Sequence, residues 1–347
     1  MRTLHFLIPG DLESRTGGYE YDRRVIAGLR ARGWTVAVHG LDASFPLPTP
    51  AALGRAAETL ASLPAGATVL VDGLALGAMP GPVAGHAHRL DLLALVHHPL
   101  ALETGLEPSL AERLRESERR ALALVRHVIV TSARTAATLS DYEVPADRIT
   151  VAVPGTDRGP IAAGSADGTV RLVCVATITP RKGHDVLIQA LAPLAPGPWR
   201  LTCVGSTSLD PGTSAGVRAL VQSLGLGSQV ELVGEADAPR TARYYQESDV
   251  FVLATWYEGY GMAVAEAIAA GLPVVSTPTG AIPELVGPEA GIMVPAGDVA
   301  GWTAALTRVL VAPERQRLTE GARRRRAGLP GWDETAQVVE RALVDHV

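Results

Sequence analysis

The sequence predicts an α/β protein with two domains, each built around a parallel sheet. In both halves of the 347-residue chain, short apolar runs typical of buried strands alternate with helical stretches. Between the halves lie residues 153–169, VPGTDRGPIAAGSADGT, which have the composition of a linker and no periodicity. The length is sufficient for two domains of ordinary size. We therefore expect domains over residues 1–155 and 156–329, followed by a helical segment over 330–347.

The first half alternates regularly between the two kinds of element. Expected strands are 4–8, 35–39, 68–71, 92–96, 127–130 and 149–151. Expected helices are 19–31, 51–63, 109–125 and 133–140. Strands that alternate with helices favour a parallel sheet covered on both faces.

The alternation restarts after the linker. Expected strands are 171–176, 200–204, 230–232, 250–253, 274–276 and 291–294. Expected helices are 183–194, 215–224, 239–247, 260–270, 299–310 and the tail from residue 332. Two such units joined by one linker predict a cleft between them, where ligands usually bind.

Composition and charge exclude several classes of protein. The hydrophobic content of 47% supports sizeable cores, and the net charge of −5 gives no electrostatic case for a nucleic-acid partner. Cys174 and Cys203 lie in apolar runs, so we expect buried free thiols. The N-terminus lacks the pattern of a signal peptide, and no apolar run is long enough to span a bilayer. A cytoplasmic location is expected, and peripheral contact with the inner membrane face stays open.

Residues 254–273, ATWYEGYGMAVAEAIAAGLP, are the most informative stretch for function. Glu258 precedes a turn of Gly259, Tyr260 and Gly261, and a run of good helix formers from Met262 then carries a second acid. The turn follows an expected buried strand, so it lies at the sheet edge where α/β proteins bind ligands. The helix N-terminus offers unpaired N–H groups that suit a phosphate. The second acid, Glu266, lies deeper in the helix, so the two carboxylates could hold opposite ends of a nucleotide-sugar.

The segment EGYGMAVAEAIAAGLPVV resembles the Glu-x7-Glu signature of family 4, a group of retaining glycosyltransferases with the GT-B fold. The resemblance is specific over residues 171–294 and diffuse in the first half. It implies two Rossmann-like domains facing across a cleft, with WDETAQVVERAL as a helix that crosses back to the first domain. By the same resemblance, Glu258 contacts the donor sugar and Glu266 contacts the ribose of the nucleotide.

A cationic loop follows the first strand of the second half. The segment PRKGHDVLIQAL is similar to the family segment whose lysine binds the donor phosphates, which here is Lys182. The family usually has an arginine five residues earlier, where this chain has Thr177. Arg181 is the expected substitute. Asp-x-Asp, His-Glu-x-x-His and Cys-x-x-Cys are all absent from the sequence, so we infer no metal and no cofactor. Protein cations must then stabilise the departing diphosphate.

Two further motifs follow strands of the first half. Gly17 and Gly18 open the first helix and allow close approach of a ligand to the backbone, as in the family's glycine-rich loop facing the donor. His97 and His98 follow the strand 92–96. In the family a histidine after this strand lies near the reacting sugar. The register favours His97, with His98 as the alternative, in a hydrogen-bonding role.

The resemblance therefore implies a hexosyltransferase-type enzyme. It would move a sugar from a UDP- or GDP-sugar to a hydroxyl of a lipid, glycan or small metabolite, with retention and without a metal. Two alternatives stay open. One is a nucleotide-sugar epimerase of the same fold. The other is a binding protein with a decayed catalytic site, which the threonine at 177 would suit.

Overall fold

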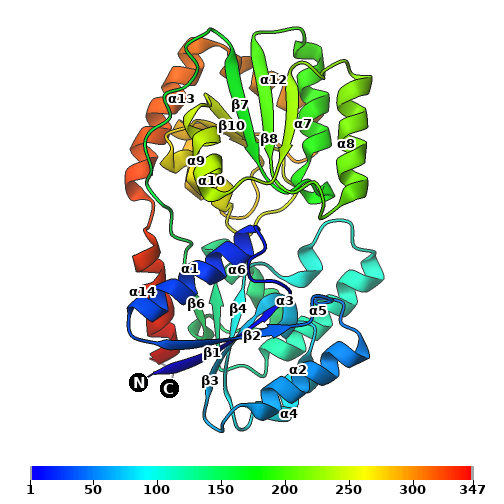
Figure 1. Ribbon diagram of the computed structural model, residues 1–347, viewed down its shortest axis with the longest axis vertical. Helices are drawn as coiled ribbons and strands as arrows, with labels where there is room; N and C mark the ends of the chain where they lie inside the picture. The colour runs from blue at the N-terminus through cyan, green and yellow to red at the C-terminus, as the bar shows by residue number, and fades with distance from the viewer. Residues whose placement is uncertain (1, 345–347) are drawn as a thin grey trace. The chain divides into compact units, whose positions relative to one another are not determined.

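The structure of the protein is a computed structural model that describes residues 2–344. The chain forms two compact units. One comprises the chain up to Gly155 and again from Pro330, and the other comprises Thr156–Leu329. Each unit is built on a six-stranded sheet whose neighbouring strands are parallel (Figure 1). This confirms the predicted α/β class of two Rossmann-like units.

The sheet of the first unit has the strand order β2-β1-β3-β4-β5-β6. Its strands are β1 (Thr3–Pro9), β2 (Thr35–Leu41), β3 (Thr68–Asp72), β4 (Asp91–Val96), β5 (His127–Val130) and β6 (Ile149–Val151). Because β2 lies on one side of β1 and all later strands lie on the other, the strand order reverses between β1 and β3. Open α/β sheets bind ligands at the carboxyl ends of the strands at such a point.

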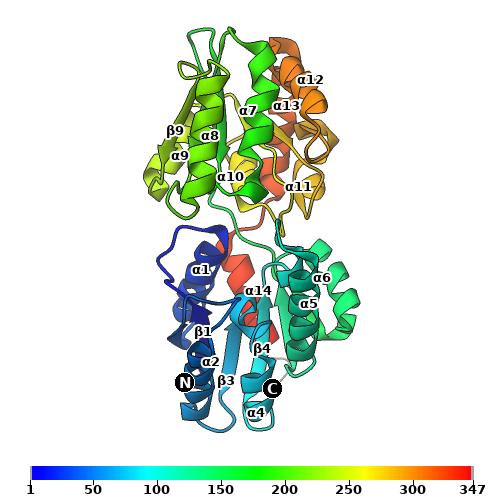
Figure 2. The ribbon, with the colours of Figure 1, turned by 90° about the vertical axis from the view of Figure 1, so that its right-hand side faces the viewer.

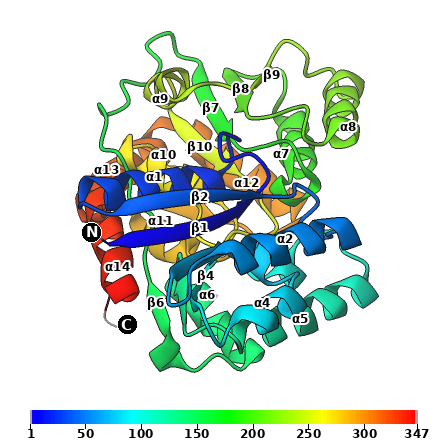
Figure 3. The same cartoon turned by 60° about the horizontal axis from the view of Figure 1, so that its bottom comes forward.

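Helices cover both faces of the first sheet. Their bounds are α1 (Gly17–Ala31), α2 (Pro50–Ser62), α3 (Gly73–Leu76), α4 (Pro80–His86), α5 (Pro108–Leu122), α6 (Ala133–Thr138) and α14 (Trp332–Val344). Figure 3 shows α1 and α14 on one face and α2, α4 and α5 on the other. The central strands β3, β4 and β5 are nearly continuous apolar runs because both of their faces are buried, whereas the edge strand β2 is partly exposed. On the α2 face, Val69, Leu92 and Val128 join Leu60 and Leu122 in one core.

The second sheet has the order β12-β11-β10-β7-β8-β9, which reverses between β7 and β10. Its strands are β7 (Val170–Val175), β8 (Trp199–Val204), β9 (Val230–Gly234), β10 (Val250–Leu253), β11 (Val274–Ser276) and β12 (Gly291–Met293). Its helices are α7 (His184–Leu191), α8 (Pro211–Ser223), α9 (Ala238–Gln246), α10 (Met262–Ala269), α11 (Ile282–Ala290), α12 (Val299–Leu310) and α13 (Ala312–Arg325). Helices α7, α8 and α12 pack together, with α7 and α8 side by side in Figure 2, while α10, α11 and α13 form another layer. Cys174 and Cys203 are buried free thiols, as predicted.

Several element boundaries differ from the predictions. Helix α10 begins at Met262 and not at Tyr260, because Gly261 has a φ of 94°, which is outside helical geometry. Helices α3, α4, α11 and α13 were not among the expected helices. Helix α4 is short and contains Pro and Gly, and α13 buries only Leu318, Gly321 and Ala322, so neither has a strong apolar stripe.

The arginine run 323–326 lies at the end of α13, and two of its side chains bond backbone carbonyl groups. Arg325 Nε donates to the carbonyl oxygen of Leu285 at 3.0 Å, and Arg326 donates to that of Gly159. These two arginines therefore tie the end of α13 to other segments of the second unit.

Helix α14 packs on α1 within the first unit. A methyl group added at Gly28 of α1 would overlap Ala336, so the two helices approach closely at this glycine. Arg32 bonds Asp333 at 2.8 Å, and Trp34 Nε1 bonds Glu340 at 3.0 Å. The predicted tail helix extends to Val347, but residues 345–347 lie outside the described residues. Across residues 2–344, no helix has the length and apolar content needed to cross a membrane.

Candidate active site

The two cations predicted in the second unit lie at its point of strand-order reversal. Arg181 and Lys182 end a short 3-10 turn (Pro180–Lys182) that follows β7. Glu258 lies in the loop after β10, and β7 and β10 are neighbours in the sheet. Because both loops leave the carboxyl ends of adjacent parallel strands, residues far apart in the sequence meet at one edge.

Two glycines allow these loops to pack this closely. Gly183 has a φ of 62°, and a side chain there would overlap the carbonyl group of Ala254 at the end of β10. Gly280, in the loop after β11, has a φ of 54°, and a side chain there would overlap the carbonyl group of Glu258. At both positions the backbone conformation and the close approach require glycine.

Glu258 is the centre of a buried ionic cluster. Its Oε1 forms an ion pair with Lys182 Nζ, lies 3.5 Å from Arg181 Nη1 and accepts a hydrogen bond from Thr255 Oγ1 at 3.2 Å. Arg181 is held in place because its Nη1 also donates to the carbonyl oxygen of Tyr257 at 2.7 Å. The side chains are largely buried, with exposed fractions of 20% for Arg181, 16% for Lys182 and 11% for Glu258.

Electrostatics in this cluster favour the charged form of the acid. Burial alone would raise the pKa of Glu258, but Lys182 and Arg181 beside it hold that pKa below its usual value. Burial lowers the pKa of Lys182, although Glu258 opposes this effect. Two cations therefore share one carboxylate, and the cluster has a positive charge left for an anionic ligand.

The other predicted residues of this unit lie along α10. Gly261 is the N-cap of α10, and Tyr260 has a buried hydroxyl for which residues 2–344 supply no hydrogen-bond partner. Glu266 Oε2 accepts a hydrogen bond at 2.9 Å from the hydroxyl of Tyr245, which is buried on α9. Sequence reasoning missed Tyr245, because a tyrosine in an amphipathic helix gives no sign of a polar contact.

In the first unit, the predicted glycines and His97 lie together. Gly17 and Gly18 begin α1, and His97 directly follows β4. A side chain at Gly18 would lie 3.5 Å from Cδ2 of the His97 ring, so the start of the helix covers the imidazole. His98 lies apart from this group, with Nε2 3.5 Å from Glu103 Oε2. Of the two histidines, His97 is therefore the one beside the glycine loop.

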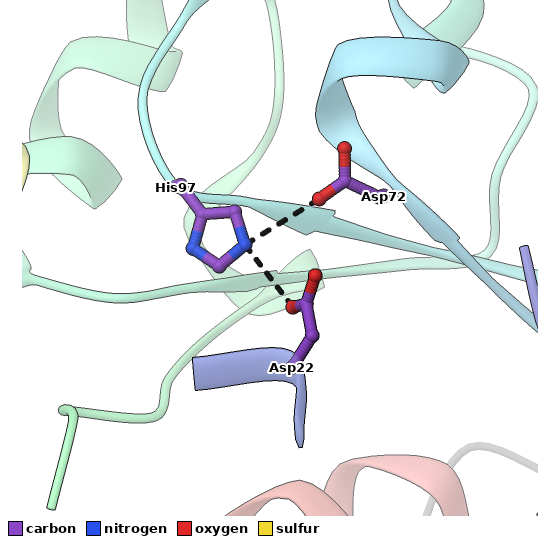
Figure 4. A group of neighbouring side chains, drawn as sticks. All are labelled: Asp22, Asp72 and His97. Atoms are coloured by element: carbon purple, nitrogen blue, oxygen red, sulfur yellow. Dashed lines mark hydrogen bonds and ion pairs between the residues drawn. The ribbon is translucent and has the colours of Figure 1, made fainter. Parts of the chain in front are cut away.

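Two aspartates that were not predicted complete this group (Figure 4). His97 Nε2 lies 3.2 Å from Asp22 Oδ1 on α1 and 3.4 Å from Asp72 Oδ2 at the end of β3. Asp72 could have been found in the sequence, because it ends a buried strand at the carboxyl edge. Asp22 could not, since an acid in a helix usually faces solvent.

Comparison with known proteins matches part of the second unit to a known family. Residues 169–311 match the model of the family described as Glycosyl transferases group 1. This region contains Lys182, Glu258 and Glu266. Residues 169–311, which lie in the second unit, therefore form a region of this glycosyltransferase family. The class of the chain as a transferase, predicted from the Glu-x7-Glu segment, is thereby confirmed.

Relatives of this glycosyltransferase carry related names. An MMP α-(1→4)-mannosyltransferase from Mycolicibacterium hassiacum is 29% identical over 87% of this chain and 77% of the relative. A D-inositol 3-phosphate glycosyltransferase from Thermomonospora curvata is 29% identical over 74% of this chain and 64% of the relative. The match to this second protein thus spans less than two thirds of its length.

Solved structures share the fold of this glycosyltransferase over its whole length. A sucrose-phosphate synthase from Thermosynechococcus elongatus has a TM-score of 0.82 at 21% identity, covering 98% of both chains. Anabaena HepE, solved in complex with UDP and glucose, has a TM-score of 0.77 at 16% identity, covering 99% of both chains. At these identities the likeness establishes the GT-B fold alone.

Proposed function

We propose that this glycosyltransferase moves a hexosyl group from a UDP- or GDP-sugar to a hydroxyl acceptor, with retention at the anomeric carbon and without a metal. The observation that carries the proposal is the buried cluster of Arg181, Lys182 and Glu258 at the strand-order reversal of the second sheet. Family membership and the names of the relatives support the class of reaction.

The cations would stabilise the departing diphosphate. Lys182 contributes a point charge and Arg181 a planar guanidinium, and the N–H groups from Gly259 to Met262 at the start of α10 add dipoles. Fixed donors aimed at a developing charge give one of the largest effects in catalysis. A diphosphate beside Lys182 would compete for the ion pair with Glu258 and release this carboxylate toward the sugar.

The remaining residues would hold the two ends of the donor. Glu266, oriented by Tyr245, accepts hydrogen bonds from the ribose hydroxyls. Glu258 would contact the transferred sugar. By the family resemblance, His97 would hydrogen-bond a sugar hydroxyl, and Gly17 and Gly18 leave room beside its ring. The bond between the anomeric carbon and the diphosphate oxygen breaks as the acceptor oxygen attacks from the same face. The acceptor proton passes to the departing phosphate oxygen, so no protein base is needed.

The test is a panel of UDP- and GDP-sugars with and without candidate acceptors, assayed in EDTA with mass spectrometry of the products. The acceptor panel includes D-inositol 3-phosphate, because relatives are named for it. Transfer of a sugar that persists in EDTA and retains the anomeric configuration supports the proposal. A new sugar nucleotide formed without acceptor would indicate an epimerase, and no turnover with any donor would indicate a decayed site.

A further inference from the structure

The imidazole of His97 faces two buried carboxylates that come from different elements. Its Nε2 lies within hydrogen-bonding distance of Asp22 on α1 and close to Asp72 at the end of β3 (Figure 4). Asp22 is fully buried, Asp72 is 2% exposed, and the His97 side chain is 19% exposed. The three groups lie where β1, β3 and β4 end, at the strand-order reversal of the first sheet.

Two buried carboxylates at this spacing require a compensating positive charge. Ionised acids are strongly disfavoured in the interior unless they are paired. Asp22 Oδ2 is buried and has no hydrogen-bond partner within residues 2–344. The hydrogen bond of this carboxylate is the one between its Oδ1 and His97 Nε2. The imidazole also packs edge-on against the ring of Tyr21, with the ring centroids 5.4 Å apart, and lies beside Gly18. Tyr19 interacts electrostatically with both aspartates. Arg23 acts on Asp22 at longer range.

The titration behaviour of the group agrees with this charge balance. Burial alone would lower the pKa of His97, but Asp22 and Asp72 raise it to about 10. Burial raises the pKa of Asp22 to about 6, although the neighbouring imidazolium opposes this effect. At neutral pH both effects correspond to an ionised Asp22 beside a positively charged His97.

The two ring nitrogens therefore have different environments. Nε2 is directed at the aspartates, whereas Nδ1 lies on the other side of the ring and makes no hydrogen bond to residues 2–344 (Figure 4). We propose, building on the function proposed above, that Asp22 and Asp72 are positioning residues that keep His97 doubly protonated. Nδ1–H is then a permanent donor to a hydroxyl oxygen of the transferred sugar, and His97 does not act as a base. Since neutral histidine can present a lone pair and the imidazolium cannot, the two roles are distinguishable by protonation state.

Histidine nitrogen chemical shifts report this state directly. We would label the protein with ¹⁵N-histidine, record long-range ¹H–¹⁵N spectra from pH 5.5 to 9 in EDTA, and assign His97 by its loss in His97→Gln. Both nitrogens of His97 are expected to remain protonated up to at least about pH 8.5. Asp22→Asn keeps an acceptor for Nε2–H but removes the carboxylate charge. It should therefore lower the midpoint of the His97 titration by about 2 pH units. Asp72→Asn should give a smaller shift, and Glu58→Gln, on the exposed face of α2, should give none.

Kinetics then test the consequence for the sugar. In Asp22→Asn, kcat/KM should fall about 10-fold above the new midpoint and recover below it. The wild type should show no such transition from pH 6 to 8.5. A wild-type His97 that titrates near its ordinary value, or an Asp22→Asn variant with an unchanged midpoint, would overturn the proposal. If Asp22→Asn fails to fold, the titrations of His97 in Asp72→Asn and in the wild type decide whether the proposal holds. The spectra require no turnover, so they stand even if the proposed transfer reaction is refuted.

Discussion

The two sheets of this glycosyltransferase place opposite charge balances at equivalent positions. In the second unit, two cations surround one carboxylate, whereas in the first, two carboxylates surround one imidazole. Both clusters lie where the strand order reverses, so the topology determines where the groups meet. The loop residues determine which ligand fits. A cation-rich cluster suits a diphosphate, and an acid-rich cluster that fixes one imidazolium suits a neutral, hydroxylated sugar.

Removing the cation of the second cluster should have the largest effect. Lys182→Ala is expected to lower kcat/KM by about 10²–10³, because it removes a fixed charge at the departing diphosphate. Lys182→Arg should recover part of the loss. Arg200→Ala, which removes an exposed cation of the same unit, is the matched control and should have little effect. Steady-state kinetics with a donor from the panel measures all three. Equal losses for Lys182→Ala and Arg200→Ala would show that Lys182 has no special role.

The sequence contains a signal for Lys182 that spacing alone does not capture. Of the 31 basic residues other than histidine, Lys182 is the only lysine, and the rest are arginines. A chain that uses arginine everywhere else and lysine here indicates a position where a compact ammonium is required. The predicted residues of the second unit could be identified from the sequence because they lie within short local motifs. Asp72 ends a buried strand and could have been singled out, but its meeting with Asp22 and His97 could not be predicted, since it depends on the order of three strands.

A pair of glycine substitutions contrasts the packing of the two sites. Gly280→Ala places a methyl group into the carbonyl group of Glu258 at a φ of 54°, so it should destabilise the protein by about 2–4 kcal/mol and impair turnover. Gly18→Ala in the first unit meets His97 at 3.5 Å, an ordinary contact, and should change stability by less than about 1 kcal/mol. Urea unfolding followed by circular dichroism compares them. Similar losses for both would contradict the close loop packing described for the second site.

One buried glutamate in each unit should make the stability of the protein depend on pH, and the two effects should have opposite directions. Burial raises the pKa of Glu118 on α5 to about 8, although the Leu100 amide that donates to it at 2.9 Å opposes this effect. An acid with a raised pKa contributes stability that is complete below its ordinary value of 4.5 and declines as the pH rises toward 8. Glu258 in the second unit has a lowered pKa, so its contribution declines on acidification instead.

Glu118→Gln tests whether ionisation of Glu118 lowers the stability of the protein as the pH rises. The amide keeps an acceptor for Leu100 and removes the buried charge, so the variant should gain about 1–3 kcal/mol relative to wild type between pH 5 and pH 8. Urea unfolding at the two pH values gives the difference. A stability difference that does not depend on pH would show that Glu118 does not titrate in this range.

Tyr245→Phe should produce the smallest effect. It removes the hydroxyl that donates to Glu266 at 2.9 Å while it preserves the buried ring. The loss of one hydrogen bond to a charged group corresponds to about 1 kcal/mol, or a rise in donor KM of about 5-fold. Truncated donors without the ribose hydroxyls should not distinguish the variant from wild type. A loss of the same size for these donors would indicate a general packing defect.

Protection of the single lysine is the most direct test of the central claim that Lys182 holds the nucleoside diphosphate. An amine-directed reagent can modify only Lys182 and the N-terminal amine, and peptide mass spectrometry separates the two sites. The account predicts that saturating UDP or GDP slows modification of Lys182 at least about 10-fold and leaves the N-terminus unaffected. Modification of Lys182 at an unchanged rate, with calorimetry showing that the nucleotide is bound, would contradict it.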